Sequence, residues 1–133
     1  MKIALSISKH FNSTSLLEVF GRSSHYYIHD TEKKSDEILS NPYYIELGGA
    51  GLQSARFLID QNVDVLITKK IGINPLRFLT SASIKVYQSK DVILTEIIKN
   101  FNEGKLNELR ISNNNIVIGG KEKDFKSSIA HNN

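Results

Sequence analysis

Residues 48–72, GGAGLQSARFLIDQNVDVLITKKIG, are the stretch of sequence that decides the fold. The first half opens with glycines and then places four apolar residues on one face at helical spacing, Leu52, Ala55, Leu58 and Ile59. The second half, residues 63–72, is a nearly continuous apolar run, which is typical of a strand buried on both faces of a parallel sheet. The stretch therefore predicts a glycine loop, a helix and a buried strand.

Before this stretch, the sequence predicts a meander of three strands. Residues 2–7, 24–30 and 36–41 are apolar or β-branched segments separated by polar turns. Between the first two, Ser15 and Glu18 have the spacing of a capping box, which predicts one short helical turn through residue 20.

After this stretch, helices and strands alternate. Asn74 and Pro75 predict the N-cap and first position of a short helix that runs through Leu79. Residues 84–88 predict a strand, and residues 91–104 predict a helix because their apolar positions repeat at helical spacing. The order βββαβαβα predicts a mixed sheet with helices on its faces and right-handed crossovers.

The length predicts one domain with its own core. The chain has 133 residues, of which 40% are hydrophobic, and a core of that size needs no disulfide or structural metal. We expect residues 1–110 to form the domain and residues 111–133 to be a C-terminal extension. Residues 116–118 predict one edge strand there, and the polar, unpatterned last dozen residues predict disorder.

The composition excludes several classes of protein. The sequence contains no cysteine, which excludes thiol nucleophiles, CxxC redox chemistry, zinc fingers and cysteine-ligated iron–sulfur sites. The formal net charge is +3 without clustering of the basic residues, so we expect no nucleic-acid partner. No apolar run approaches the roughly 20 residues of a membrane span, and no signal-peptide cleavage site follows the N-terminus. We therefore expect a cytoplasmic protein without a membrane partner.

The glycine loop is the first candidate site. Gly48, Gly49 and Gly51 let the backbone approach a ligand, and the N–H groups from Gly49 to Gln53 lie at the start of the predicted helix, where they attract anions. The loop lacks the Gly-Lys-Ser/Thr of a P-loop, and no strand precedes it as in a dinucleotide fold. Two interpretations stay open, an anion or cofactor cradle and a tight turn required by chain geometry.

Loops at the carboxyl ends of the predicted strands supply the other candidates, because ligands of open α/β sheets bind at that edge. Asn74 stands at a strand-to-helix junction, where two interpretations stay open: it contacts a ligand, or it only caps the helix. Arg22 and His10 can reach the same crevice from their loops. His10 is the best candidate metal ligand, with an exposed bystander as the alternative. His25 and His29 lie on one predicted strand about 13 Å apart, too far to share a metal ion.

Five pieces of sequence follow one another in an order that resembles a known family. They are residues 1–8, MKIALSIS; residues 20–23, FGRS; residues 48–51, GGAG; residues 64–72, DVLITKKIG; and residues 84–87, IKVY, followed by a helix and residues 103–106, EGKL. In order and spacing they resemble the dinitrogenase iron-molybdenum cofactor biosynthesis family, the NifX-like domains, from about residue 1 to residue 110. The resemblance implies a ribonuclease H-like three-layer α/β/α fold with a five-stranded mixed sheet.

The resemblance also implies a non-enzymatic function. Such a chain would carry an iron–sulfur or iron–molybdenum type cluster, or its anionic precursor, among cluster-assembly proteins, as a monomer or weak dimer. Val19 stands where the family commonly has a basic residue or histidine, which favours the alternative of a regulatory or interaction protein with a degenerate crevice. A metal-dependent phosphodiesterase on the same scaffold is the remaining alternative, although residues 2–7 hold no acid and no GxSxG elbow occurs.

Overall fold

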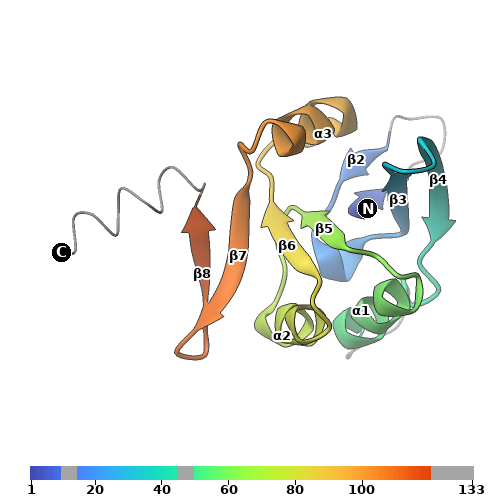
Figure 1. Ribbon diagram of the computed structural model, residues 1–133. Helices are drawn as coiled ribbons and strands as arrows, with labels where there is room; N and C mark the ends of the chain where they lie inside the picture. Colours follow the sequence, from blue (N-terminus) through green and yellow to red (C-terminus); the bar gives the residue numbers. More distant parts are fainter. Residues whose placement is uncertain (10–14, 45–49, 121–133) are drawn as a thin grey trace.

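The computed structural model describes residues 1–9, 15–44 and 50–120, which fold into one mixed sheet with helices packed against it (Figure 1). In chain order the elements are β1 (Lys2–Ser8), β2 (Leu16–Leu17), the 3-10 helix η1 (Phe20–Arg22), β3 (His25–Asp30), β4 (Ser35–Ser40), α1 (Ala50–Asp60), β5 (Val65–Thr68), α2 (Ile73–Ser81), β6 (Lys85–Gln88), α3 (Leu94–Asn102), β7 (Asn107–Ser112) and β8 (Asn115–Gly120). The α/β class predicted from the sequence is confirmed.

The strands lie in the order β4-β3-β1-β5-β6-β7-β8, and β2 pairs with the end of β1 beside this row. β1, β5 and β6 run parallel at the centre, with Leu5 opposite Ile67 and Thr68 opposite Gln88. β3 and β4 on one side, and β7 and β8 on the other, pair antiparallel with their neighbours. The three parallel strands therefore end at a common edge, which we name the carboxyl edge.

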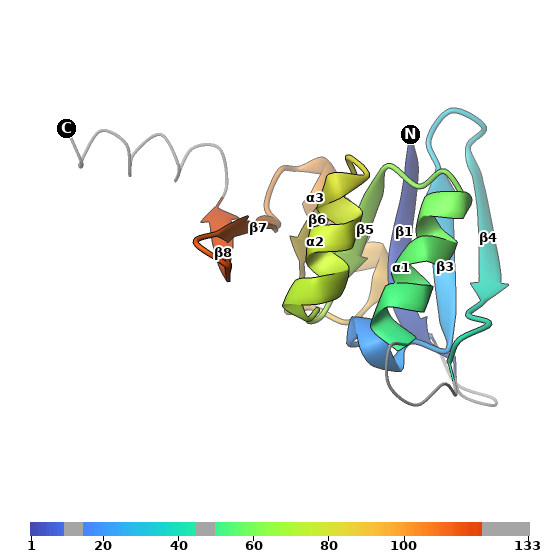
Figure 2. The same ribbon diagram turned by 90° about the horizontal axis from the view of Figure 1, so that it is seen from below.

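Helices cover both faces of the sheet, so the molecule has three layers (Figure 2). On one face, Leu58 of α1 and Leu79 of α2 belong to the same buried core as Leu66 of β5. On the other face, Ile97 of α3 belongs to a core with Ile67 of β5. All four residues of β5 are buried, as expected for a strand that is covered on both faces. Within the described part of the chain, no helix is both long and apolar enough to cross a membrane.

The sheet has eight strands, whereas the expected number was five. The five predicted strands are all present, as β1, β3, β4, β5 and β6. Beyond these five, β8 includes the edge strand expected at 116–118, and the strands that were not expected are β2 and β7. β2 has two residues, too few to show a periodicity. In β7 the apolar residues Leu109 and Ile111 stand among polar neighbours, which obscures the alternation.

The helical turn predicted from Ser15 and Glu18 is wrong, because residues 16–17 form β2 instead. Glu18 Oε1 accepts the N–H of the next residue at 2.8 Å and does not reach back to cap a helix. The N–H of Leu17 donates to the C=O of Val92 at 3.0 Å, far along the chain. Pairing with a distant segment therefore outweighs the local capping signal.

The hairpin of β7 and β8 extends the sheet beyond the last helix (Figure 1). Asn113 and Asn114 form its two-residue turn with φ of 52° and 62°, which suits a type I′ turn and the tolerance of asparagine for this conformation. The predicted domain boundary at residue 110 falls inside β7, and β8 includes the edge strand expected at 116–118. Residues 121–133, for which the sequence predicts disorder, lie outside the described residues.

Candidate functional site

The candidate site is the carboxyl edge, where β1, β5 and β6 end side by side. Lys9 follows β1, Lys69 follows β5, and Lys90 lies two residues after β6. α1 and α2 also begin at this edge, because each of them leads into the amino end of the next parallel strand (Figure 2). A ligand here would contact loops and helix starts.

Residues 16–22, which we name the covering segment, cross the strand ends and are held there by backbone hydrogen bonds. The N–H of Glu18 donates to the C=O of Ser6 in β1 at 2.8 Å. The N–H of Phe20 donates to the C=O of Lys70, after β5, also at 2.8 Å, and the Phe20 side chain is buried in the core. The covering segment therefore fixes η1 beside the loop between β5 and α2.

Two buried hydroxyl groups support the covering segment from beneath. Ser6 Oγ and Thr68 Oγ1 lie 2.7 Å apart on neighbouring strands. They lie 2.8 Å and 3.2 Å from the carbonyl oxygen of Glu18. Both residues are fully buried, so their hydroxyl groups need partners inside the protein. This contact explains why a serine and a threonine are buried in two central strands.

Exposed cations gather on the covering segment and at the strand ends. They are Lys9, Arg22, Lys69, Lys70 and Lys90. In the described ranges, no carboxylate lies within 4.0 Å of any of these charges. The two carboxylates nearest in sequence make hydrogen bonds to neutral groups: Glu18 accepts the N–H of Val19 within the covering segment, and Asp91 Oδ2 accepts a hydrogen bond from Asn100 Nδ2 at 3.0 Å. Among the described residues, these cations at the carboxyl edge therefore make no close ion pair, and their charge attracts anions.

His25 is a functional candidate that its sequence spacing conceals. It opens β3 opposite Ile7, near the end of β1, because the two strands are antiparallel. His25 Nδ1 lies 2.9 Å from Ser24 Oγ, which accepts the N–H of Lys9 at 3.1 Å. Burial, and then the charge of Lys9, lower the pKa of His25 from its usual 6.5. The lowered pKa favours the neutral imidazole, the form that binds a metal or accepts a hydrogen bond.

The described residues of the predicted site share one corner of the carboxyl edge. Arg22 ends η1, which contacts α1, and α1 packs against α2. Ala50 and Gln53 lie in the first turn of α1, and Asn74 lies in the first turn of α2. The side chains of Arg22, Gln53 and Asn74 are exposed. The predicted residues that lie outside the described part of the chain are His10, Gly48 and Gly49.

Gly51 and Pro75 bring the two helix starts together. A Cβ atom on Gly51 would lie 3.3 Å from Cγ of Pro75, so the glycine permits close packing of α1 on α2. For Gly51, chain geometry is therefore a sufficient reason for glycine. The N-cap predicted at Asn74 is wrong, because α2 begins at Ile73 with Gly72 in the N-cap position and no side-chain cap. Asn74 is left with an exposed amide at this corner.

The donor set at this edge is unlike that of a site for a bare metal ion. Among residues 1–9, 15–44 and 50–120, no three His, Asp or Glu side chains gather closely enough to hold a metal together. The sequence has no cysteine. Cations, helix-start N–H groups and one neutral imidazole instead suit an anion, or a ready-made cluster whose outer atoms are negatively charged.

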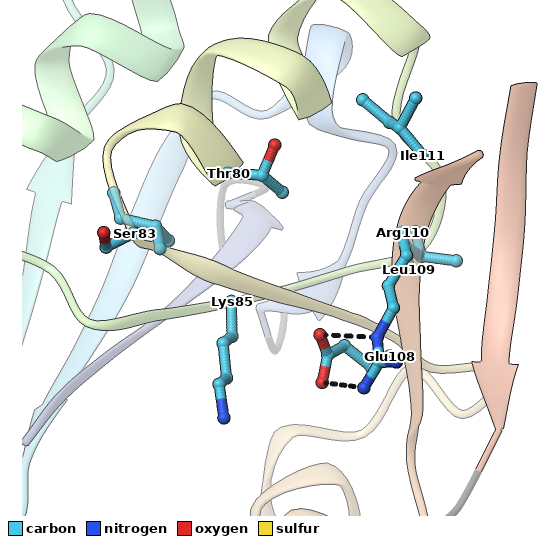
Figure 3. A pocket seen from close by; sticks show the side chains of 8 residues that line it. Thr80, Ser83, Lys85, Glu108, Leu109, Arg110 and Ile111 are labelled. Atoms are coloured by element: carbon cyan, nitrogen blue, oxygen red, sulfur yellow. Dashed lines mark hydrogen bonds and ion pairs between the residues drawn. The ribbon is translucent and has the colours of Figure 1, made fainter. Parts of the chain in front are cut away.

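A groove with a volume of about 400 Å³ lies elsewhere, between the end of α2 and strands β6 and β7 (Figure 3). Its lining includes Thr80, Ser83 and Lys85. Arg110 Nε in the same groove lies 3.1 Å from Glu108 Oε2, so these charges compensate each other. The groove lies toward the amino ends of the parallel strands, away from the cations of the carboxyl edge.

Solved structures with this fold include the apo form of the orange protein from Desulfovibrio gigas, with a TM-score of 0.70 and 24% identity over 79% of this chain and 89% of that chain. A second is a putative NifB protein from Thermotoga, with a TM-score of 0.65 and 28% identity over 79% of this chain and 90% of that chain. These similarities confirm the mixed α/β fold.

An uncharacterized protein of Methanocaldococcus jannaschii is 32% identical over 109 residues, which cover 80% of this chain and 89% of that protein. The family model described as dinitrogenase iron-molybdenum cofactor matches residues 1–104, which contain the whole carboxyl edge and end before β7. The resemblance identified from the sequence is thereby confirmed. The chain belongs to the dinitrogenase iron-molybdenum cofactor family.

Proposed function

We propose that this protein binds an anionic metal cluster, or its anionic precursor, at the carboxyl edge and carries it during cluster assembly. The observation that supports this most directly is the uncompensated charge of Lys9, Arg22, Lys69, Lys70 and Lys90, none of which pairs with a described carboxylate. The family supports the class of cargo, because its model is described by the iron-molybdenum cofactor of dinitrogenase. We infer a carrier and not an enzyme.

Uncompensated charge at an exposed edge has the properties that a carrier needs. Like charges on neighbouring loops repel one another, so a bound anion relieves the repulsion and stabilises the folded state. Ion pairs at an exposed edge are screened by salt, with a Debye length of about 8 Å at physiological ionic strength. Cargo held in this way is released more easily than cargo bound through thiolates, which suits transfer to a second protein.

The proposed contacts are of three kinds. Cationic and amide side chains, with Arg22 and Asn74 at the shared corner, would bind the negative outer atoms of the cargo. Imidazole nitrogens of His25 and His10 would reach its metal atoms, with His10 as the metal ligand expected from the sequence. Backbone N–H groups at and before the start of α1 would attract its charge. This last group comprises Gly48, Gly49, Ala50, Gly51 and Gln53.

We also propose the partners and the cellular compartment of this function. Cluster-assembly proteins would supply and receive the cargo in the cytoplasm, without nucleic acid or a membrane. We also propose a ribonuclease H-like classification for the scaffold, which the order β4-β3-β1-β5-β6 supports.

A titration of the full chain tests the proposal. Isolated iron-molybdenum cofactor, under anaerobic conditions, and inorganic phosphate are the two probes, followed by thermal stabilisation and, for the cofactor, by visible absorption. We expect the double variant Lys69→Gln with Lys70→Gln to weaken binding of both probes by about tenfold. The matched control is Lys33→Gln with Lys34→Gln, which removes two adjacent lysines from the turn at the opposite end of the sheet.

Two outcomes would contradict the proposal. If both double variants bind the cofactor as the wild type does, the charge of the carboxyl edge is not used. If the wild type binds neither probe, the protein does not carry an anion there, and the regulatory or interaction protein that Val19 favours takes first place. High salt should weaken binding to the wild type more than to the Lys69 and Lys70 double variant, because fewer exposed charges remain to be screened.

A further inference from the structure

β8 is an edge strand with little protection against pairing, because the one protective feature among its described residues is an irregularity near its end, where the pairing with β7 shifts register between Glu108 and Leu109. Its sequence, NIVIGG, contains no charged residue and no proline. The side chains of Ile116, Val117 and Ile118 are 36%, 38% and 58% exposed. Natural edge strands commonly carry lysine or proline, or are covered, because their unpaired backbone groups can add another strand. An exposed apolar edge of this kind indicates an interaction surface.

The register of the hairpin determines which backbone groups of β8 face outward. A two-residue turn such as that at residues 113–114 closes with a hydrogen-bonded pair, and bonded and non-bonded pairs alternate from there. Val117, opposite Arg110, therefore directs its N–H and C=O toward β7. Ile116 and Ile118 direct theirs away from the sheet, two residues apart, as a further antiparallel strand requires.

We propose that β8 pairs antiparallel with β8 of a second copy of this chain, about a two-fold axis at Val117. Ile116 of each copy then lies opposite Ile118 of the other, and their outward N–H and C=O groups bond to one another. The isoleucines form cross-strand apolar pairs on one face, and the two Val117 side chains meet on the other. Residues 116–118 read the same in both directions, so the surface is complementary to itself.

Charge also favours a second copy as the partner. β8 contains no charged residue, so the two β8 strands that meet at the two-fold axis do not place like charges opposite each other. The nearest charged side chain opposite Val117 is Arg110, one strand further in, and its Nε lies 3.1 Å from Glu108 Oε2. Among the described residues, a two-fold pairing therefore places no unpaired charge next to its own copy.

The size of the contact predicts a weak dimer. β8 has six residues, and an edge contact of that length buries less than the roughly 800 Å² per partner of a standard interface. We expect a dissociation constant on the order of 10 to 100 µM. The hairpin lies beyond residues 1–104, which match the family model, so this surface is additional to the carboxyl edge and independent of its proposed function.

Sedimentation of the full chain over a concentration series tests the dimer. Val117→Glu places two carboxylates opposite each other across the axis, while each of them faces Arg110 within its own hairpin, which preserves the fold. We expect the dissociation constant to rise at least tenfold, which corresponds to roughly 1.4 kcal/mol of binding free energy. The control is Phe78→Glu, at an exposed apolar residue of α2, which should leave it unchanged. Equal weakening by the two variants would overturn the proposal.

A disulfide test locates the axis. The sequence has no cysteine, so Val117→Cys introduces a single thiol. A non-hydrogen-bonded antiparallel pair has Cα atoms about 4.5 Å apart, within the range that a disulfide spans. We expect mild oxidation to link Val117→Cys at least tenfold faster than Phe78→Cys at the same concentration, roughly 1.4 kcal/mol in barrier. Equal rates, or a chain that sediments as a monomer up to roughly 500 µM, overturn the proposal.

Discussion

The sheet ends in two edge strands that differ in charge. β4, SDEILS, carries Asp36 and Glu37, and β8, NIVIGG, carries no charge. Charges on an edge strand oppose pairing with another sheet, because pairing would bury them or bring them together. The edge within the family-matched residues is thus protected by charge against association, whereas the hairpin beyond residue 104 adds an edge without charge.

The two edges are also attached to the molecule by different kinds of contact. Beyond the end of β4, Asn41 is buried, and its Nδ2 donates to the C=O of Ser23 at 2.9 Å and to Ser54 Oγ at 3.1 Å. The β8 edge depends on apolar packing of β7, in which Leu109 is 4% exposed and belongs to the core under α2. Substitutions at the two edges should therefore differ in size and in their dependence on pH.

The largest effect is expected at the β8 edge. Leu109→Ala removes a buried side chain that joins the hairpin to the core, and it should lower the free energy of unfolding by about 2–4 kcal/mol. Urea unfolding at constant pH measures the loss. Ile118→Ala, at the residue paired with Leu109 on β8, is the control, because a 58% exposed side chain should cost less than about 1 kcal/mol. Equal losses would mean that β8 packs as tightly as β7.

An intermediate effect is expected beside β4. Asn41→Ala leaves the C=O of Ser23 and the hydroxyl of Ser54 without this buried partner, and it should cost about 1–3 kcal/mol. The same urea unfolding experiment measures it. Asn41→Asp keeps the acceptor at 3.1 Å from the N–H of Tyr43 but loses the amide donor, so it should not restore the wild-type stability. A fully stable Asn41→Ala variant would show that water satisfies these groups.

The elements that the sequence predicts are those whose pattern is local. β5 is recognisable because its four residues are all apolar or small and all buried. The covering segment is not recognisable, because its contacts join Leu17 to Val92 and Phe20 to Lys70, across 75 and 50 residues of chain. No window of sequence contains both members of such a pair, so a capping signal at Ser15 was the strongest local pattern present.

The candidate site also contains some parts that local sequence predicts and others that depend on contacts between distant segments. The junctions that begin α1 and α2 follow from the glycines and from Pro75, and the structure brings them together. His25 could not be found by spacing, because its position at the carboxyl edge follows from the antiparallel pairing of β3 with β1. The cations come from η1 and from the residues that follow three strands, and they form a group only once these elements are placed side by side.

The smallest effect is expected from the charge on the β4 edge itself. His29 Nδ1 contacts Asp36 Oδ1 across β3 and β4, and this hydrogen bond lowers the pKa of Asp36 below its usual 3.8. A carboxyl group with a lowered pKa in the folded state stabilises the protein above its unfolded pKa, and the contribution is lost as the pH falls through the folded pKa. Because the pair is half exposed and screened by solvent, we expect less than about 1 kcal/mol.

Asp36→Asn should therefore unfold at lower urea than the wild type at about pH 5 to 7, and the two midpoints should converge as the pH falls toward about 2, where Asp36 of the wild type is protonated. Glu37→Gln is the matched control, because it removes one charge from the neighbouring position of the same strand without touching the His29 contact. A difference between wild type and Asp36→Asn that stays constant down to about pH 2 would show that the amide, and not the lost charge, is responsible. If the two midpoints converge at low pH, the charge of Asp36 both stabilises the fold through His29 and marks the exposed edge of β4. No residue of β8 carries such a charge.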